Sequence, residues 1–330
     1  MKIAVIGSGS WGCAVSVLLA NNGHTVYLWS WLAEESRRLK HDRENRDLLP
    51  GVPFPDGIVC TDNMAACVRG AELIVCASPS VATRSVAKSL APHVPDGQLI
   101  VNISKGLEEN TLMRLSEVYA EEIPQAEIAV MSGPSHAEEV SRGLPTTNVV
   151  AARNHDIAKK IQDVFMNDVF RVYTGDDIIG VELGGALKNV IALCAGVSDG
   201  MGFGDNTKAA LMTRGLAEIT RLGVAMGAQR ETFAGLSGVG DLIVTCTSMH
   251  SRNRRAGILL GQGKSLDDTL KEVHMVVEGV NTATAAYRLS QKYGVEMPIT
   301  EAAYCVLYEG KSPREAVYDL MKRDKKIETY

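Results

Sequence analysis

Lys188, Lys105 and Asp241 are the residues of this sequence whose types and settings best suit them to moving a proton. Lys188 lies in an apolar stretch, residues 181–197, that has helical periodicity, so its side chain could be buried among apolar neighbours. A lysine ordinarily titrates near ~10.4, and burial or a nearby positive charge such as Lys105 lowers that pKa. A lysine tuned in this way can give and take a proton near neutral pH, as a general acid–base does.

Each of these residues also has a simpler interpretation. The amine of Lys188 could reach solvent from a helix edge. Lys105 could be an ordinary loop lysine, and Asp241 a turn or helix-capping residue. For any one residue alone these alternatives stay open. His136 is a further candidate base, which we rank below Lys188.

A second polar group, Ser251-Arg252-Asn253, could bind a phosphate. Its members supply a hydroxyl, a guanidinium and an amide, which are donors suited to phosphate oxygens. The alternative is that residues 252–255 form a solvated basic helix face. Four such residues in a chain of formal net charge −5 are too few to predict nucleic-acid binding.

The segment from Gly7 to Gly12, GSGSWG, has the spacing G-x-G-x-x-G and follows an apolar run, residues 3–6. A strand, this turn and a helix in that order form the fingerprint of dinucleotide binding. Gly7 permits the tight turn, Gly9 lets a pyrophosphate approach the backbone, and Gly12 lets the helix pack against the strand. The sequence therefore predicts NAD or NADP as cofactor.

The end of the second predicted strand bears on which of the two cofactors is used, because NAD enzymes usually carry Asp or Glu there. Ser30 and Trp31 occupy that place, and the first acidic residue is Glu34. Arg37 and Arg38 follow within two turns. The choice stays open, and the missing carboxylate favours NADP slightly.

Short apolar runs alternate with helical patterns in the first half, which is typical of a parallel sheet with crossover helices. The predicted strands are residues 3–6, 25–29, 73–76, 99–103, 128–131, 147–151 and 169–173. Beyond them the predicted elements are helices, at residues 181–197, 207–226, 252–260, 265–272, 281–293 and 301–308. We therefore predict an α/β fold: a Rossmann-type doubly wound sheet in residues 1–177 and an all-helical substrate domain in residues 178–330.

Composition narrows the possible classes of protein. The chain has 330 residues, 45% of them apolar and 22% charged, as in globular proteins. No apolar run approaches the ~20 residues of a membrane span, and a glycine motif that begins at Gly7 leaves no room for a signal peptide. The seven cysteines are scattered, odd in number and without C-x-x-C spacing, so we expect reduced thiols and no metal site. These features predict a cytoplasmic protein.

Four segments together resemble the NAD(P)-dependent glycerol-3-phosphate dehydrogenases in their bacterial form. They are NISKGL around Lys105, SGPSHAEE from Ser132, GGALKNVIA around Lys188, and GVGDLI with SRNRR around Asp241 and Arg252. The likeness runs from Gly7 to VVEG at Val276–Gly279. It implies reduction of dihydroxyacetone phosphate to sn-glycerol 3-phosphate, a phospholipid precursor, on a Rossmann-type domain followed by a helical one. A homodimer is the expected assembly.

The resemblance also implies roles for individual residues. Lys188 would be the general acid–base, Lys105 would polarise the carbonyl, and Asp241 would orient them. The remaining substrate contacts would come from Gly133, Ser135, Asn189, Thr245, Ser251, Arg252 and Asn253. The cofactor contacts would come from Gly7, Gly9, Ser10, Trp11, Gly12, Ser30, Trp31, Lys105, Ala137, Arg252, Val276 and Glu278.

Two other functions remain as alternatives. One is another enzyme of this architecture, a β-hydroxyacid dehydrogenase or ketopantoate reductase, whose substrates carry a carboxylate in place of a phosphate. The other is a non-catalytic NAD(P)-binding sensor, which predicts cofactor binding without turnover and an eroded set of Lys105, Lys188 and Asp241. All three residues are present, which favours an enzyme.

Overall fold

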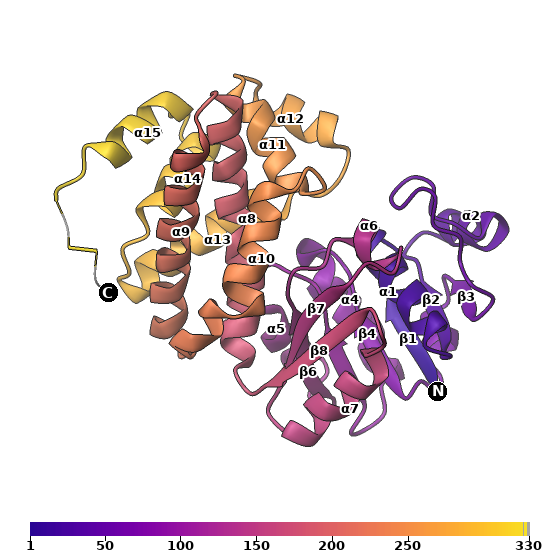
Figure 1. Cartoon of the computed structure of the whole chain (residues 1–330). Coiled ribbons are helices and arrows are strands. Elements are labelled where there is room, and N and C mark those ends of the chain that lie inside the picture. Colours follow the sequence, from indigo (N-terminus) through magenta and orange to yellow (C-terminus); the bar gives the residue numbers. More distant parts are fainter. Residues whose placement is uncertain (326, 329–330) are drawn as a thin grey trace.

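The computed structural model describes residues 1–325 and 327–328, arranged as a sheet flanked by helices and a second part made of helices (Figure 1). One eight-stranded sheet has the order β3-β2-β1-β4-β5-β6-β7-β8. Its first six strands are parallel, β7 runs antiparallel to β6, and β8 is parallel to β7. The strands are β1 (Lys2–Ile6), β2 (Thr25–Trp29), β3 (Ile58–Thr61), β4 (Leu73–Cys76), β5 (Leu99–Asn102), β6 (Glu127–Ser132), β7 (Thr146–Ala152) and β8 (Phe170–Gly175). The predicted Rossmann-type sheet is confirmed.

Strand β3 was not predicted, because it lies at the edge of the sheet and does not form a continuous apolar run. Its residues alternate between buried and more exposed, and Val59 is 40% exposed. By contrast β1, β4 and β5 are buried on both faces, which requires apolar residues in succession.

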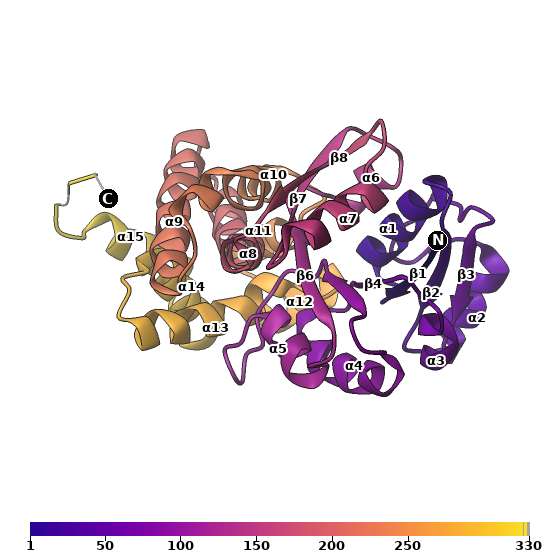
Figure 2. The ribbon, with the colours of Figure 1, turned by 90° about the horizontal axis from the view of Figure 1, so that it is seen from below.

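Both faces of the sheet are covered by helices (Figure 2). Ile3 and Val5 of β1 point into a core shared with α1 and α7, while Ala4 and Ile6 point into a core shared with α3, α4 and α5. The helices of this part are α1 (Ser10–Asn21), α2 (Ala33–Asp42), α3 (Met64–Val68), α4 (Thr83–Leu90), α5 (Leu115–Glu122), α6 (Ala137–Val140) and α7 (His155–Phe165).

The second part is built around the long helix α8, against which α9, α10, α11 and α13 pack (Figure 1). Its helices are α8 (Ile178–Gly200), α9 (Asp205–Ala225), α10 (Asp241–Thr247), α11 (Arg252–Gly261), α12 (Leu266–Val273), α13 (Glu278–Tyr293), α14 (Pro298–Tyr308) and α15 (Pro313–Met321). The residues between α8 and α9, which include Gly202 and Gly204, form an interhelical loop. The predicted all-helical second part is confirmed.

Helix α8 corrects one expectation from the sequence. It has 23 residues and, within the described residues, is the one helix long and apolar enough to cross a membrane by length and composition. We had expected no apolar stretch to approach that length. However, 83% of its most apolar stretch is buried inside the fold, which is the setting of a core helix.

Helices α8 and α11 cross with their backbones in close approach, and this requires glycine. A Cβ atom at Gly196 would lie 2.1 Å from the carbonyl oxygen of Arg254, and one at Gly257 would lie 2.1 Å from that of Leu193. No side chain fits in either space. The crossing brings the first turn of α11 beside the middle of α8, where Lys188 and Asn189 lie.

A buried ion pair joins the helical part to the sheet part. Glu182 in α8 accepts hydrogen bonds from the Arg114 guanidinium and from the Ser116 backbone amide, both at 2.8 Å, at the start of α5. Burial raises the pKa of Glu182, and the positive charge of Arg114 opposes that rise. These contacts hold α8 in a fixed position against the sheet.

Candidate active site

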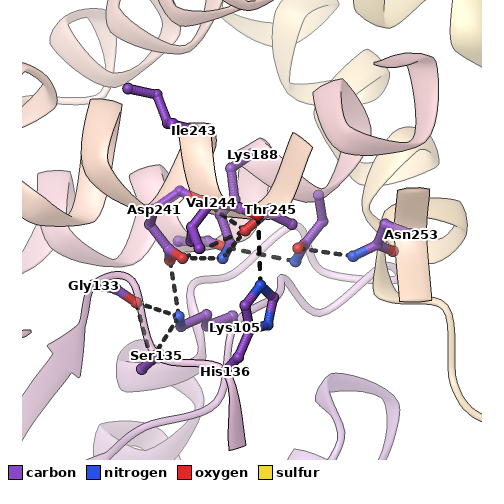
Figure 3. A network of polar contacts seen from close by, with 12 residues as sticks. Lys105, Gly133, Ser135, His136, Lys188, Asp241, Ile243, Val244, Thr245 and Asn253 are labelled. Carbon is purple, nitrogen blue, oxygen red and sulfur yellow. Dashed lines mark hydrogen bonds and ion pairs between the residues drawn. The ribbon is translucent and has the colours of Figure 1, made fainter. Parts of the chain in front are cut away.

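Asp241 joins the two lysines singled out from the sequence (Figure 3). Its Oδ2 atom accepts a hydrogen bond from Lys105 Nζ at 2.8 Å, and its Oδ1 atom accepts one from Lys188 Nζ. Lys188 Nζ also donates to Thr245 Oγ1 at 2.7 Å. Lys188 is 5% exposed and Asp241 1% exposed, so one carboxylate balances two largely desolvated ammonium groups.

Four separate segments bring this network together: α8, which carries Lys188, α10, and the segments that follow β5 and β6. Lys105 follows the carboxyl end of β5, and its ammonium donates to the Gly133 carbonyl at 2.8 Å and to Ser135 Oγ at 3.3 Å, just past the end of β6. The carboxyl edge of a parallel sheet is where such folds bind ligands. Asp241 begins α10 directly after a π-helical turn, Leu236–Gly240, and Thr245 lies one turn further along.

The surroundings of Lys188 bring its pKa into the range of proton transfer at neutral pH. Burial is the largest effect, and with the positive charge of Lys105 it outweighs the attraction of Asp241. Together they lower the pKa of Lys188 from 10.5 to about 7. Because Lys188 is 5% exposed, the interpretation of its amine as reaching solvent is wrong.

The network opens onto a cleft of about 670 Å³ between the sheet part and the helical part. The predicted site residues that line it are Gly9, Ser10, Trp11, Lys105, Ser135, Ala137, Lys188, Asn189, Thr245, Ser251, Arg252, Asn253, Val276 and Glu278. Asp241 and Gly133 lie behind the residues that line the cleft. Asp241 accepts hydrogen bonds from both lysines, and the Gly133 carbonyl accepts one from Lys105. The cleft thus runs from the glycine-rich turn to the lysine pair.

The glycine-rich turn has the geometry that a bound dinucleotide needs. Gly7 has φ +118°, and a Cβ atom at Gly12 would lie 1.9 Å from the Gly7 carbonyl oxygen, so neither position accepts a side chain. Gly9 has open space in front of it and precedes α1, whose first turn has no side-chain cap. The Trp11 indole N–H is buried without a partner among the described residues, and Trp11 lines the cleft. This unpaired donor and the uncapped start of α1 fit a polar cofactor.

At the other wall of the cleft lie the three residues predicted to bind phosphate. The Ser251 hydroxyl caps α11 by accepting from the Arg254 amide at 3.2 Å. Asn253 donates to Asn189 Oδ1 at 2.9 Å and accepts from the Gly279 amide at 2.8 Å. Among the described residues, the guanidinium of Arg252 makes one hydrogen bond, of 3.3 Å, to the Val276 carbonyl, and burial lowers its pKa. Arg252 therefore retains the most free donors of the three.

Comparisons with known proteins agree with this geometry. The family model described as NAD-dependent glycerol-3-phosphate dehydrogenase N-terminus matches residues 2–158, and the model described as the C-terminus matches residues 177–318. The chain belongs to the NAD-dependent glycerol-3-phosphate dehydrogenase family. The resemblance found in the four segments is confirmed.

Individual members of the family match along nearly their whole length. A protein of Agathobacter rectalis named glycerol-3-phosphate dehydrogenase, NAD(P)+, is 57% identical over 99% of this chain and 97% of its own. The structure of glycerol-3-phosphate dehydrogenase from Coxiella burnetii has a TM-score of 0.94 at 38% identity, over 98% of this chain and 99% of that one. A ketopantoate reductase from Ralstonia eutropha matches with a TM-score of 0.62 at 16% identity, over 96% of this chain and all of that one, and shares the fold alone.

Four of the residues predicted to bind the cofactor do not line the cleft. Gly7 and Gly12 lie under the turn, where they shape the backbone. Ser30 is fully buried, and its hydroxyl has no partner among the described residues. Trp31 is 62% exposed and lies edge-on to Trp29. Of these four, Gly7, Ser30 and Trp31 lie around the end of β2.

Among the cleft residues that sequence reasoning did not assign to the site, three are basic: His250, His274 and Arg255. Arg255 could have been found, since it lies three residues after Arg252 and therefore on the same helix face. His136, which we ranked below Lys188, also lines the cleft, with its ring 5.7 Å from that of His250. Burial and the charge of Lys188 lower the pKa of His136. Among the described residues no group of three or more His, Cys, Asp or Glu side chains could hold a metal ion.

Proposed function

We propose that this chain interconverts dihydroxyacetone phosphate and sn-glycerol 3-phosphate, with NAD(P) as the hydride carrier. The observation that supports this most strongly is the pair of lysines held by one buried carboxylate, at the end of a cleft that also contains a glycine-rich turn and Arg252. When bound, the reduced nicotinamide supplies the hydride for the carbonyl carbon. The chain supplies the proton, the charge stabilisation and the phosphate site.

In ketone reduction, Lys188 Nζ gives a proton to the carbonyl oxygen as negative charge develops there, and the lysine is left neutral. Lys105 stays charged and stabilises the developing oxyanion. Asp241 fixes both amines, and Thr245 accepts from Lys188 and so sets its orientation. In the reverse direction the neutral Lys188 removes the proton from the substrate hydroxyl.

We assign the remaining cleft residues to cofactor contacts, according to whether they lie on the sheet side or on the helical side of the cleft. Gly9, Ser10 and Trp11 would hold the cofactor pyrophosphate, with Ala137 near the nicotinamide ring. Val276 and Glu278 would contact the cofactor from the helical side. Glu278 already accepts from the backbone amide and the hydroxyl of Ser80 in the sheet part, at 3.0 and 2.5 Å. It thereby links the helical part to the sheet part beside the cleft.

The pH dependence of the two directions should be opposite. Because the pKa of Lys188 is lowered to about 7, its ammonium form is lost as the pH rises through that value. We expect kcat/KM for ketone reduction to fall with rising pH and kcat/KM for alcohol oxidation to rise. Both substrates carry a phosphate, so its ionisation changes kcat/KM in the same sense for both directions. Opposite trends therefore report on Lys188 and not on the phosphate. Profiles that move in the same direction would remove Lys188 from its role.

Replacing Arg252 with alanine should weaken binding of the phosphorylated ketone. A charge-assisted contact is removed, so we expect KM for dihydroxyacetone phosphate to rise roughly 10–100-fold with a smaller effect on kcat. Steady-state kinetics with dihydroxyacetone, which has no phosphate, provide the control. If both substrates lost efficiency equally, the phosphate assignment would be wrong, and a carboxylate substrate would become the leading alternative.

We place the division between the domains at residues 177 and 178, and we propose a cytoplasmic homodimer that binds neither nucleic acid nor membrane. The proposed product, glycerol 3-phosphate, would serve phospholipid synthesis. Light scattering of the purified protein measures the assembly directly, and a monomer mass would contradict the proposed dimer.

A further inference from the structure

An acidic residue contacts the glycine-rich turn from a place that the usual fingerprint does not cover. Ser8 lies between Gly7 and Gly9, and its hydroxyl donates to Glu35 Oε2 at 2.9 Å. Glu35 belongs to the first turn of α2, six residues beyond the end of β2 at Trp29. Its carboxylate is thus held against the turn that faces the cofactor.

The backbone around this contact is fixed from two sides. The buried side chain of Asn45 donates to the Ser8 carbonyl at 2.9 Å. The Gly7 amide donates to the Trp29 carbonyl at 3.1 Å, which places the turn beside the end of β2. In dinucleotide-binding folds the adenosine ribose lies near this junction, and an acidic residue there accepts from its 2′-hydroxyl. The carboxylate of Glu35 therefore lies beside the expected ribose position, although it comes from the helix and not from the strand end.

Two of the neighbouring cations, Arg38 and Arg43, are engaged elsewhere. The guanidinium of Arg38, on the same face of α2 as Glu35, pairs with Asp47 at 2.9 Å. Arg43 donates to the carbonyls of Phe54, Pro55 and Ile58. Arg37 is exposed, and its Nε atom faces the Ala33 carbonyl at 3.4 Å. The charged group in hydrogen-bond contact with the turn is therefore an anion, which opposes a 2′-phosphate.

We propose that Glu35 is a specificity-determining residue that selects NAD(H) over NADP(H), by accepting from the ribose hydroxyls and repelling the 2′-phosphate. The proposal names the cofactor of the proposed reaction. The kcat/KM measurements below rest on that reaction, whereas the binding measurements do not. It reverses the slight preference for NADP expected from Ser30 and Trp31. That expectation considered the end of the strand alone.

The test measures binding and turnover separately. Dissociation constants for NADH and NADPH come from fluorescence titration without substrate, and kcat/KM comes from assays with dihydroxyacetone phosphate. We expect the unmodified protein to prefer NADH by ~10-fold or more, because two like charges a few ångströms apart in partly screened surroundings cost at least that factor.

Two substitutions follow from the same argument. Glu35→Gln keeps the shape and an acceptor for Ser8 but removes the charge, so the preference should shrink ~5-fold or more, chiefly through tighter NADPH binding. Glu35→Arg should shift it further toward NADPH. Glu34→Gln removes an exposed carboxylate one residue away and is the matched control, with an unchanged ratio expected.

Three results would overturn the proposal: a preference of the unmodified protein for NADPH, equal affinity for both cofactors, or an unchanged ratio in folded Glu35→Gln. The first two need no variant, so misfolding of a variant, checked by circular dichroism, leaves the proposal testable. Clear NADH-selective binding without turnover would support the role of Glu35 and contradict the proposed reaction. Failure of the Glu35 proposal can therefore be distinguished from failure of the proposed reaction.

Discussion

Lys188→Ala is expected to lower kcat for dihydroxyacetone phosphate reduction by roughly 10²–10⁴-fold, while the cofactor still binds. The substitution removes the group proposed to protonate the developing alkoxide. Lys105 is already committed to Gly133, Ser135 and Asp241, so it is poorly placed to replace it. Single-turnover kinetics, together with a cofactor titration, separate a lost proton donor from a lost binding site.

Lys208→Ala provides the matched control for Lys188→Ala. Lys208 in α9 also pairs with an aspartate, Asp199, at 2.8 Å, but it does not line the cleft. Its loss should leave kcat within a few-fold of the unmodified enzyme. If Lys188→Ala behaved like this control, the proposed role of Lys188 would have to be abandoned.

Asp241→Asn is expected to have the second large effect, because both ammonium groups lose the carboxylate that balances them. The attraction of Asp241 raises the pKa of Lys188, so without it that pKa should fall and less of the acid form should be present at neutral pH. We expect kcat/KM for ketone reduction to drop about 10²-fold at neutral pH.

The pH profile distinguishes this electrostatic effect of Asp241→Asn from simple structural damage. An electrostatic loss should be partly recovered at lower pH, where Lys188 is protonated again. Stability should also fall, by about 1–3 kcal/mol, since the amines of Lys105 and Lys188 lose the buried carboxylate that accepts their hydrogen bonds. A loss of activity that is uniform across pH in a normally folded variant would contradict the argument.

The sheet was predictable because parallel strands buried on both faces must be apolar in succession, as in β1, β4 and β5. Edge strand β3 carries no such signal. Helix α10 is preceded by a π-helical turn and begins at Asp241, so a segment that the sequence marked only as GVGDLI proved to be the start of a helix. Local propensity does not determine such a start.

The site was predicted less from spacing than from resemblance. Asp241 lies 136 residues from Lys105 and 53 from Lys188, and no periodic pattern connects positions so far apart. The apolar neighbours of Lys188 in the helix suggested burial, but the sequence left open whether its amine reached solvent. The contact between Ser8 and Glu35 could not, because it depends on how α2 turns back toward the glycine-rich turn.

The most direct test of the account is NAD(P)H oxidation by the purified protein with dihydroxyacetone phosphate, run with NADH and NADPH in separate assays. The account predicts rapid loss of reduced-cofactor absorbance that requires the phosphorylated ketone, with NADH the better cofactor. Absence of turnover with either cofactor, despite demonstrable cofactor binding, would contradict the proposed reaction and favour a carboxylate substrate or a cofactor sensor.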